Sequence, residues 1–403
     1  MAVNSLTFEQ VSTVLTSIVK QATNQDVIKP TDTGSFVSVA QIALRADRDA
    51  VMNAISNVLA RTIFSIRPYS AKLTGLEMDS FRWGNMMRKL SIADDAWQDD
   101  PAYAWPATYD ATEDPATGNG EKIDPWTIKK PDILQTNFYG ASVYFDEMTI
   151  FEDQIESAFS GPEQLGSFLT LLMTNLSNRL EMSNEGLRRG LVCNAVAAVK
   201  AENNSARNIH LLTEYNSATG ETFTKADIMH PDNFKGFSEW MYSRVANLTD
   251  LFTANSTMFQ TVIASKPILR HTPLEMQRLY MFSPLLRQIE ARVLADTYHD
   301  SFIRYSDVES LAYFQSIQTP DTVKAVPCYT GTDGAVVTAS DTVTVQNVVG
   351  LLFDRDAMGM TVLDRRVLST PLNTKGLYRN IHVHCKQRVF FDSTEKVALL
   401  TLD

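Results

Sequence analysis

Residues 161–200 limit the fold more than any other part of the sequence, because they predict one very long helix. The tetrapeptide "SGPE" at 160–163 has the pattern of a capping box with proline in the first turn. At a rise of 1.5 Å per residue the helix would be roughly 55–60 Å long and would span a whole domain. Gly186 and Gly190 weaken it and permit a bend. Apolar residues recur on one helical stripe, at Leu165, Phe168, Leu169, Leu172, Leu176, Leu180, Leu187, Leu191, Ala195 and Val199.

The segments around this helix predict a mixture of α and β structure. Residues 1–34 indicate an arm with one short helix, and residues 36–66 have helical periodicity. Residues 231–260 predict another, shorter helix, and from residue 301 the pattern is mostly β. The last forty residues alternate, so they predict a strand with two distinct faces. One face carries Ile381, Val383, Cys385, Gln387, Val389 and Phe391, and the other carries His382, His384, Lys386 and Arg388.

Composition excludes several classes of protein. The chain has 403 residues and a net charge of -11, whereas a dedicated nucleic-acid binder needs a basic surface. No apolar stretch approaches the length that spans a bilayer, and the first residues show no secretory signal. The three cysteines, Cys193, Cys328 and Cys385, are odd in number and far apart, which favours reduced thiols in a cytoplasm over a disulfide framework.

The region between residues 68 and 148 is unusual for a compact domain. Two extended segments, 81–97 and 133–145, flank an acidic stretch rich in Pro, Gly, Asn and Asp. A connection of this length inside a domain is normally functional or leaves the body of the protein. Four of the five tryptophans lie here, namely Trp83, Trp97, Trp105 and Trp126.

Three patterns invite a chemical interpretation. Asp354 and Asp356 follow an apolar strand and would share one face if the strand continued, about 6–7 Å apart, as in a glycosidase pair. The residues that follow them, Ala357, Met358, Gly359 and Met360, include no sugar-stacking aromatics, so a charged strand end is the stronger interpretation. The "HVHC" at 382–385 suggests zinc, but Cys385 points to the opposite face from the histidines.

A calcium loop is the third pattern. Its first, third, fifth and twelfth places are filled by Asp110, Thr112, Asp114 and Glu121. The sixth place, which needs glycine for a sharp turn, is Pro115, so a solvated acidic loop is favoured. The sequence contains no phosphate loop, dinucleotide fingerprint, nucleophile elbow or zinc-protease helix motif.

The order of these parts resembles the major capsid protein of tailed double-stranded-DNA bacteriophages, whose fold encapsulins share. "VVGLLFDRDAMGM" is similar to the family's late axial-domain strand, and "NTKGLYRNIHVHCKQRVFFDSTEKVALLTLD" to its C-terminal segment. The resemblance implies an α+β fold with an arm, an extended β-hairpin loop, a peripheral domain with a long spine helix, and an axial domain with a mixed sheet. The arm and first helix are expected at 1–70, the extended loop at 71–147 and the peripheral domain at 148–245. The axial domain is expected at 246–362, and strands that return to the peripheral domain at 363–403.

The resemblance also implies a function. The subunit would self-assemble through hexamers and pentamers into an icosahedral head shell around the DNA genome, with the loop tryptophans as contacts between subunits. It would be no enzyme, with no cofactor, no catalytic or metal residues and no membrane contact, and Asp354, Arg355 and Asp356 would serve a turn. Two alternatives are an encapsulin-like compartment and a cytoplasmic hydrolase that uses Asp354 and Asp356.

Further partners follow from the same resemblance. About 35 residues precede the first predicted long helix, too few for the cleaved scaffolding segment of some family members. We therefore expect a separate scaffolding protein, together with a portal and room for a decoration protein. Packaged DNA would be held only non-specifically, and assembly would take place in the bacterial host cytoplasm before the subunit resides in the virion capsid.

Overall fold

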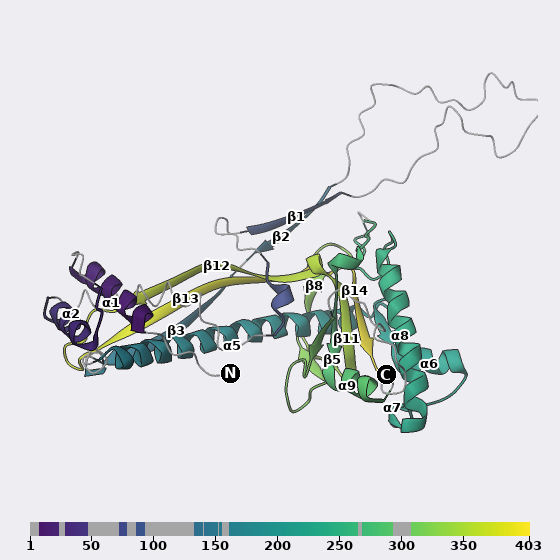
Figure 1. The fold of residues 1–403 in the computed structure, drawn as a ribbon. Helices are drawn as coiled ribbons and strands as arrows, with labels where there is room; N and C mark the ends of the chain where they lie inside the picture. The colour runs from purple at the N-terminus through teal and green to yellow at the C-terminus, as the bar shows by residue number, and fades with distance from the viewer. Residues whose placement is uncertain are drawn as a thin grey trace, which may run out of the picture.

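The fold combines a long limb with a compact body (Figure 1). A computed structural model describes residues 8–23, 29–46, 72–78, 86–92, 133–139, 141–151, 153–154, 161–264, 268–292 and 308–403. Helices and strands mix in both parts, which confirms the predicted α+β class. Within these ranges, no helix is both long enough and apolar enough to cross a membrane.

Helix α5 (Pro162–Glu202) runs through both parts, and its 41 residues confirm the predicted long helix. The predicted capping box is wrong, because Gly161 is the N-cap and no side chain bonds to the first turn. Pro162 supplies the start instead, since its fixed backbone angle suits the first helical position. The helix ends at Glu202, two residues beyond the predicted limit, and the left-handed backbone of its C-cap, Asn203 (φ 53°), stops it.

The limb is a three-stranded antiparallel sheet packed on the first half of α5. Its strands are β12 (Met358–Ser369), β13 (Tyr378–Phe391) and β3 (Ser142–Phe151), in the order β12-β13-β3. Val383 and Cys385 of β13 pack on Leu176 of α5. The predicted alternation holds as far as Gln387, with the histidines on the other face. Arg388 keeps its predicted place on the histidine face, since β13 continues as one strand to Phe391, and its side chain is buried.

The body contains a mixed five-stranded sheet in the order β4-β14-β11-β5-β6. Its central strand β11 (Val348–Asp354) is buried throughout and runs antiparallel to both of its neighbours. The two outer pairs, β14 with β4 and β5 with β6, are parallel. The other strands are β4 (Asn208–His210), β14 (Val397–Thr401), β5 (Gln277–Phe282) and β6 (Val308–Leu311).

Helices cover both faces of this sheet. On one face the core includes Leu211 of α6, Phe234 to Phe252 of α8, and Ile289 of α9. On the other face the last turns of α5 bury Leu191, Val196 and Val199. The helices are α6 (Leu211–Thr219), α7 (Lys225–Met229), α8 (Pro231–Thr253) and α9 (Ser283–Arg292), and α8 confirms the predicted helix in this region. Small strands complete the body: β7 (Val323–Ala325), β8 (Cys328–Thr330), β9 (Val336–Thr338) and β10 (Val343–Val345).

Two smaller units join the limb. Helices α1 (Phe8–Thr23) and α2 (Thr33–Ala46) lie at its far end, so the predicted arm helix is confirmed (Figure 1). Strands β1 (Met86–Ile92) and β2 (Ile133–Tyr139) form an antiparallel hairpin that projects away from α5. The hairpin confirms extended structure at 86–92 and 133–139 within the two predicted segments, and residues 81–85 and 93–97 lie outside the described residues. The rest of the predicted helix 36–66, beyond residue 46, lies outside the described residues.

Two glycines test the packing of these elements. A side chain at Gly350 of β11 would place its Cβ 2.7 Å from the backbone oxygen of Tyr280, which a change of rotamer cannot relieve. A Cβ added at Gly186 of α5 would instead have no atom within 4 Å. We therefore expect Gly350→Ala to destabilise unassembled subunits by about 1–3 kcal/mol. Gly186→Ala should stabilise them by about 1 kcal/mol, through its higher helix propensity.

Urea unfolding of unassembled subunits, followed by circular dichroism, checks this pair. The expected midpoints lie on opposite sides of the wild-type value. Equal midpoints for the wild type and Gly350→Ala would contradict the close packing of β11 against β5.

Candidate functional site

The chain crosses between its two sheets twice, and the two corners lie side by side. The outbound corner follows β11 and contains the short 3-10 helix η4 (Arg355–Ala357). The return corner, residues 392–396, joins β13 to β14. The Asp392 N–H donates to the Ala357 carbonyl (2.7 Å), and the Asp354 N–H donates to the Lys396 carbonyl (2.9 Å). We call these two corners the junction.

Asp354 has a structural role in the outbound corner. Its side chain is buried, and Oδ1 accepts the Asp356 N–H at 2.8 Å. Oδ2 accepts the Thr272 hydroxyl at 2.6 Å. Because the strand ends at Asp354 and Asp356 lies in η4, the two carboxylates are not alternate residues of one strand. The geometry therefore favours the turn over the glycosidase pair.

Lys89 of β1 fastens the hairpin to the return corner. Its Nζ lies 2.9 Å from Asp392 Oδ2 and 2.5 Å from Glu395 Oε1, and it donates to the Asp356 carbonyl at 3.4 Å. The Asp392 side chain is completely buried, and its other oxygen accepts the N–H (3.0 Å) and hydroxyl (2.6 Å) of Thr394. A buried charge needs such partners, because an unpaired one is costly.

Electrostatics at the return corner keep the pair of Lys89 and Asp392 ionised. Burial disfavours each charge, but the opposite charges outweigh it: the pKa of Lys89 is raised and that of Asp392 is lowered. At Glu395 burial wins over the attraction of Lys89 and Arg270, so the pKa of this carboxyl is raised. The ionised form of Glu395 is therefore less favoured than that of Asp392.

A second cation reinforces the same contact. Arg270 Nη1 lies 2.7 Å from Glu395, and its Nη2 donates to Ser91 Oγ of β1 at 3.0 Å. On the neighbouring strand, the ring of Phe138 packs 5.1 Å from that of Phe390. Both strands of the hairpin are thus held through one face, which we call the inner face.

The opposite face of the hairpin carries exposed apolar side chains. Leu90 and Ile92 are 61% and 60% exposed, and Ile133, which pairs with Ile92, is 51% exposed. We call these three residues the hairpin outer face. Large apolar side chains grouped on one side of a projecting element mark an interaction surface.

Lys396 secures the junction from the side of the body. Its buried amine donates to the Phe252 and Ala254 carbonyls, at 3.0 and 2.7 Å, at the end of α8. Burial lowers the pKa of this lysine to about 8, against the attraction of Asp354 and Glu395. A cation at the C-terminal end of a helix also complements the helix dipole.

The sequence did not predict the structural roles of Lys89, Lys396, Arg270 and Arg188. The side chain of Arg188, in the apolar stripe of α5, is fully buried and bonds to the Glu77 carboxylate and the Lys72 carbonyl. The backbone of Glu77 in turn bridges Met360 of β12. The one sequence feature that could have drawn attention to Arg188 is a charged residue on an otherwise apolar helical face. That feature does not show which residue pairs with it.

The zinc pattern at 382–385 is divided between the two sides of the limb sheet. His382 and His384 flank Phe145 on the outer side of the limb sheet, with ring centroids at 5.3 and 5.4 Å, while Cys385 is buried on the inner side. Among the described residues, no three His, Cys, Asp or Glu side chains are grouped to hold a metal ion. The calcium pattern at 110–121 lies outside the described residues, as do the four loop tryptophans, Trp83, Trp97, Trp105 and Trp126.

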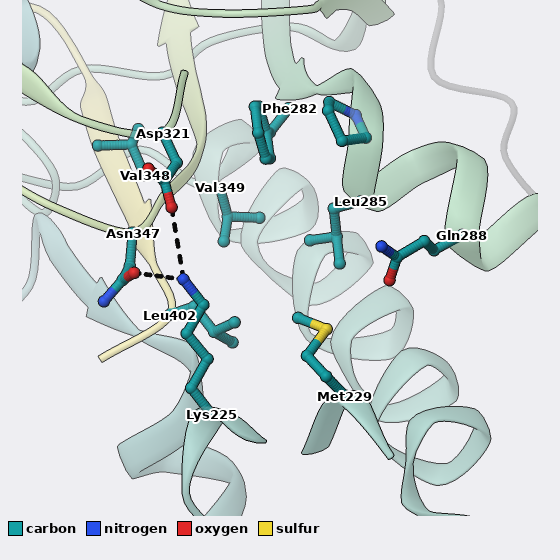
Figure 2. A pocket seen from close by; sticks show the side chains of 11 residues that line it. Lys225, Met229, Phe282, Leu285, Gln288, Asp321, Asn347, Val348, Val349 and Leu402 are labelled. Carbon is teal, nitrogen blue, oxygen red and sulfur yellow. Dashed lines mark hydrogen bonds and ion pairs between the residues drawn. The ribbon is translucent and has the colours of Figure 1, made fainter. Parts of the chain in front are cut away.

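A cavity of about 210 Å³ opens at the end of the body sheet, between α7 and α9 (Figure 2). Apolar side chains, including Met229 and Leu285, form most of its wall. Lys225 closes the polar side, with its amine 3.4 Å from Asp321 and hydrogen-bonded to Asn347. The eleven lining residues include no Ser, Thr, Cys or His, and the cavity's two charged groups, Lys225 and Asp321, face each other as an ion pair.

The hairpin attachment yields a direct prediction. Lys89→Met leaves the buried Asp392 without its cation, which should destabilise the subunit by about 3 kcal/mol, the low end for a broken buried pair. The low end applies because a fifth (21%) of the Lys89 side chain is exposed. Lys386→Met, on the half-exposed face of β13, is the control and should change stability by less than about 0.5 kcal/mol.

Urea unfolding and hydrogen exchange of the β1 amides measure both effects. The Lys89 variant should show a lower midpoint and faster exchange in β1. Unchanged exchange in β1 would mean that Lys89 does not hold the hairpin.

Comparisons with known proteins identify a family. The sequence matches the family of the Phi29-like phage major capsid protein over residues 15–401. No curated protein matches the chain.

Several solved phage structures are similar over most of the chain. A chain in the capsid structure of Staphylococcus phage Andhra is 10% identical in sequence, with a TM-score of 0.49. The alignment covers 84% of the present chain and 87% of the phage Andhra chain. A chain in the capsid structure of Cyanophage P-SCSP1u is 12% identical, with a TM-score of 0.42. The alignment covers 84% of the present chain and 89% of the cyanophage chain.

The assignment rests on the sequence match to the family, which extends over nearly the whole chain. This family is a class of structural proteins and not of enzymes, in keeping with a junction whose carboxylates serve turns and ion pairs. The chain belongs to the Phi29-like phage major capsid protein family and is a structural subunit that self-assembles into the capsid of the virion.

Proposed function

We propose that the subunit forms hexamers and pentamers in which the β1–β2 hairpin lies across a neighbouring copy. The observation that carries this proposal is the asymmetry of the hairpin. Its inner face is fastened by Lys89 and Ser91, whereas its outer face leaves Leu90, Ile92 and Ile133 exposed. Contact with a neighbour would bury the exposed half of each side chain, and each burial would favour association by roughly 1 kcal/mol.

The tryptophans fit the same proposal by their place in the sequence. Trp97, Trp105 and Trp126 lie between β1 and β2, and Trp83 precedes β1. Aromatic side chains are enriched where protein surfaces meet, because they supply a large contact area. We assign these four residues as contacts between subunits.

The domain division follows from the same assignment. Residues 1–70 form the arm, 71–147 the extended loop, 148–245 the peripheral domain, 246–362 the axial domain and 363–403 the returning strands. Support for it comes from β12 and β13, which join the limb to the body at the junction.

Further partners complete the proposal. A separate scaffolding protein and a portal take part in assembly in the host cytoplasm, and a decoration protein has room on the shell. The net charge of -11 supports confinement of the DNA genome without specific binding.

Ile92→Asp tests the hairpin contact. A carboxylate on the outer face should leave the subunit folded, because the side chain is 60% exposed, but it should weaken association by about 2 kcal/mol per contact. That loss corresponds to roughly a thirtyfold lower association constant. Ile317→Asp, at a loop position of the body that is 76% exposed, is the matched control.

Light scattering and electron microscopy of the two variants give the readout, with co-expressed scaffolding protein where assembly needs it. Shells from Ile317→Asp and unassembled subunits from Ile92→Asp are the expected result. Normal shells from Ile92→Asp would refute the hairpin contact.

A further inference from the structure

Strand β3 forms an edge of the limb sheet, with β13 as its one neighbour in the described sheet. Its ten residues pair with β13 from Ser142 to Phe151 without any shift in register. The opposite edge strand, β12, has a register shift between Val362 and Asp364 and is bridged by Glu77. Edge strands are protected from pairing by bulges, prolines or charged side chains, and β3 has no bulge, proline or lysine, with Asp146 and Glu147 as its two charged residues.

Two side-chain contacts show which backbone groups of β3 point to the free edge. The Glu147 N–H donates to Asp146 Oδ1 at 3.0 Å, and the Phe151 N–H donates to Gln154 Oε1 at 3.3 Å. Side-chain oxygens thus take the place of a neighbouring strand. Because alternate residues of a strand direct their backbone groups to opposite sides, the odd-numbered residues from Val143 to Phe151 face the free edge.

The same odd-numbered residues carry exposed apolar side chains on the outer side of the sheet. Val143 is 62% exposed, Phe145 is 55% exposed and Phe151 is 47% exposed. Only Glu147 and Thr149 are polar in this set. A long, regular edge with exposed aromatic side chains is therefore prepared for another β-strand.

We propose that β3 pairs with β3 of a second copy, antiparallel across a two-fold axis. Two limb sheets then become one six-stranded sheet. The occupant is a second copy because the chain is a capsid subunit, and because an antiparallel strand pair satisfies both partners with the same surface. The backbone carbonyls of the partner replace Asp146 and Gln154 as acceptors.

Side-chain chemistry selects the register. A two-fold axis at Glu147 would place two carboxylates directly opposite each other, which is unfavourable. An axis at Met148 places Phe145 opposite Phe151 of the second copy, and Glu147 opposite Thr149, each pair occurring twice. Aromatic cross-strand pairs are favourable, and the like charges move apart. The pairing therefore centres on Met148.

This contact is separate from the proposed hairpin contact, because it involves a different edge of the molecule. Disulfide trapping tests it in assembled shells. Of the three cysteines, Cys328 is exposed, so the background carries Cys328→Ser. Glu147→Cys and Thr149→Cys are then introduced separately, and shells are assembled from each variant and from an equal mixture.

The mixture should form disulfide-linked dimers after mild oxidation, because hydrogen-bonded partners have Cα atoms about 5.5 Å apart, within disulfide reach. Each variant alone should not, because identical positions lie on the diagonal at about 7–8 Å. A dimer from Glu147→Cys alone would refute the register centred on Met148. Absence of dimers from all three shells would refute the pairing itself.

Hydrogen exchange provides a second measurement that needs no substitution. In wild-type shells the amides of Phe145 and Thr149 should exchange at least about tenfold more slowly than in unassembled subunits, because strand pairing protects them. Equal exchange in both forms would overturn the proposal even if the cysteine variants failed to assemble.

Discussion

The hydrogen bonds between the two corners of the junction hold the limb and the body in one arrangement. Strands β11 and β14 are neighbours in the body, and their continuations β12 and β13 are neighbours in the limb. The corners use the same device: an aspartate oxygen accepts the N–H of the residue two positions later. Asp354 does so with Asp356 at 2.8 Å, and Asp392 does so with Thr394 at 3.0 Å. The limb therefore cannot turn without breaking buried bonds.

Helix α5 provides the second link between limb and body. Its first half packs on the limb sheet through Leu176, and its last turns belong to the core of the body through Val196. With the sheets joined at the junction and the helix shared by both cores, the hairpin has a fixed base. The proposed contact between the hairpin and a neighbouring subunit needs such a base, because a loose hairpin would lose conformational entropy on binding.

The sequence predicted the elements whose signal is local. The stripe from Leu172 to Val199 predicted α5, and the alternation around Val383 predicted β13, because periodicity depends only on neighbours along the chain. The junction could not be predicted in this way. Lys89 and Asp392 are 303 positions apart, and nothing in the residues around Lys89 names its partner. The burial of Arg388 could not be predicted either, because alternation along a strand assigns a side chain to a face and does not say what covers that face.

Electron cryo-microscopy of assembled shells tests the central claim most directly, namely that a hairpin fixed at the junction joins neighbouring subunits. The account predicts density that connects Lys89 with Asp392 within one subunit and places Leu90 and Ile92 against a different copy. A hairpin whose outer face packs on its own subunit, or one detached from the return corner in every copy, would contradict the account.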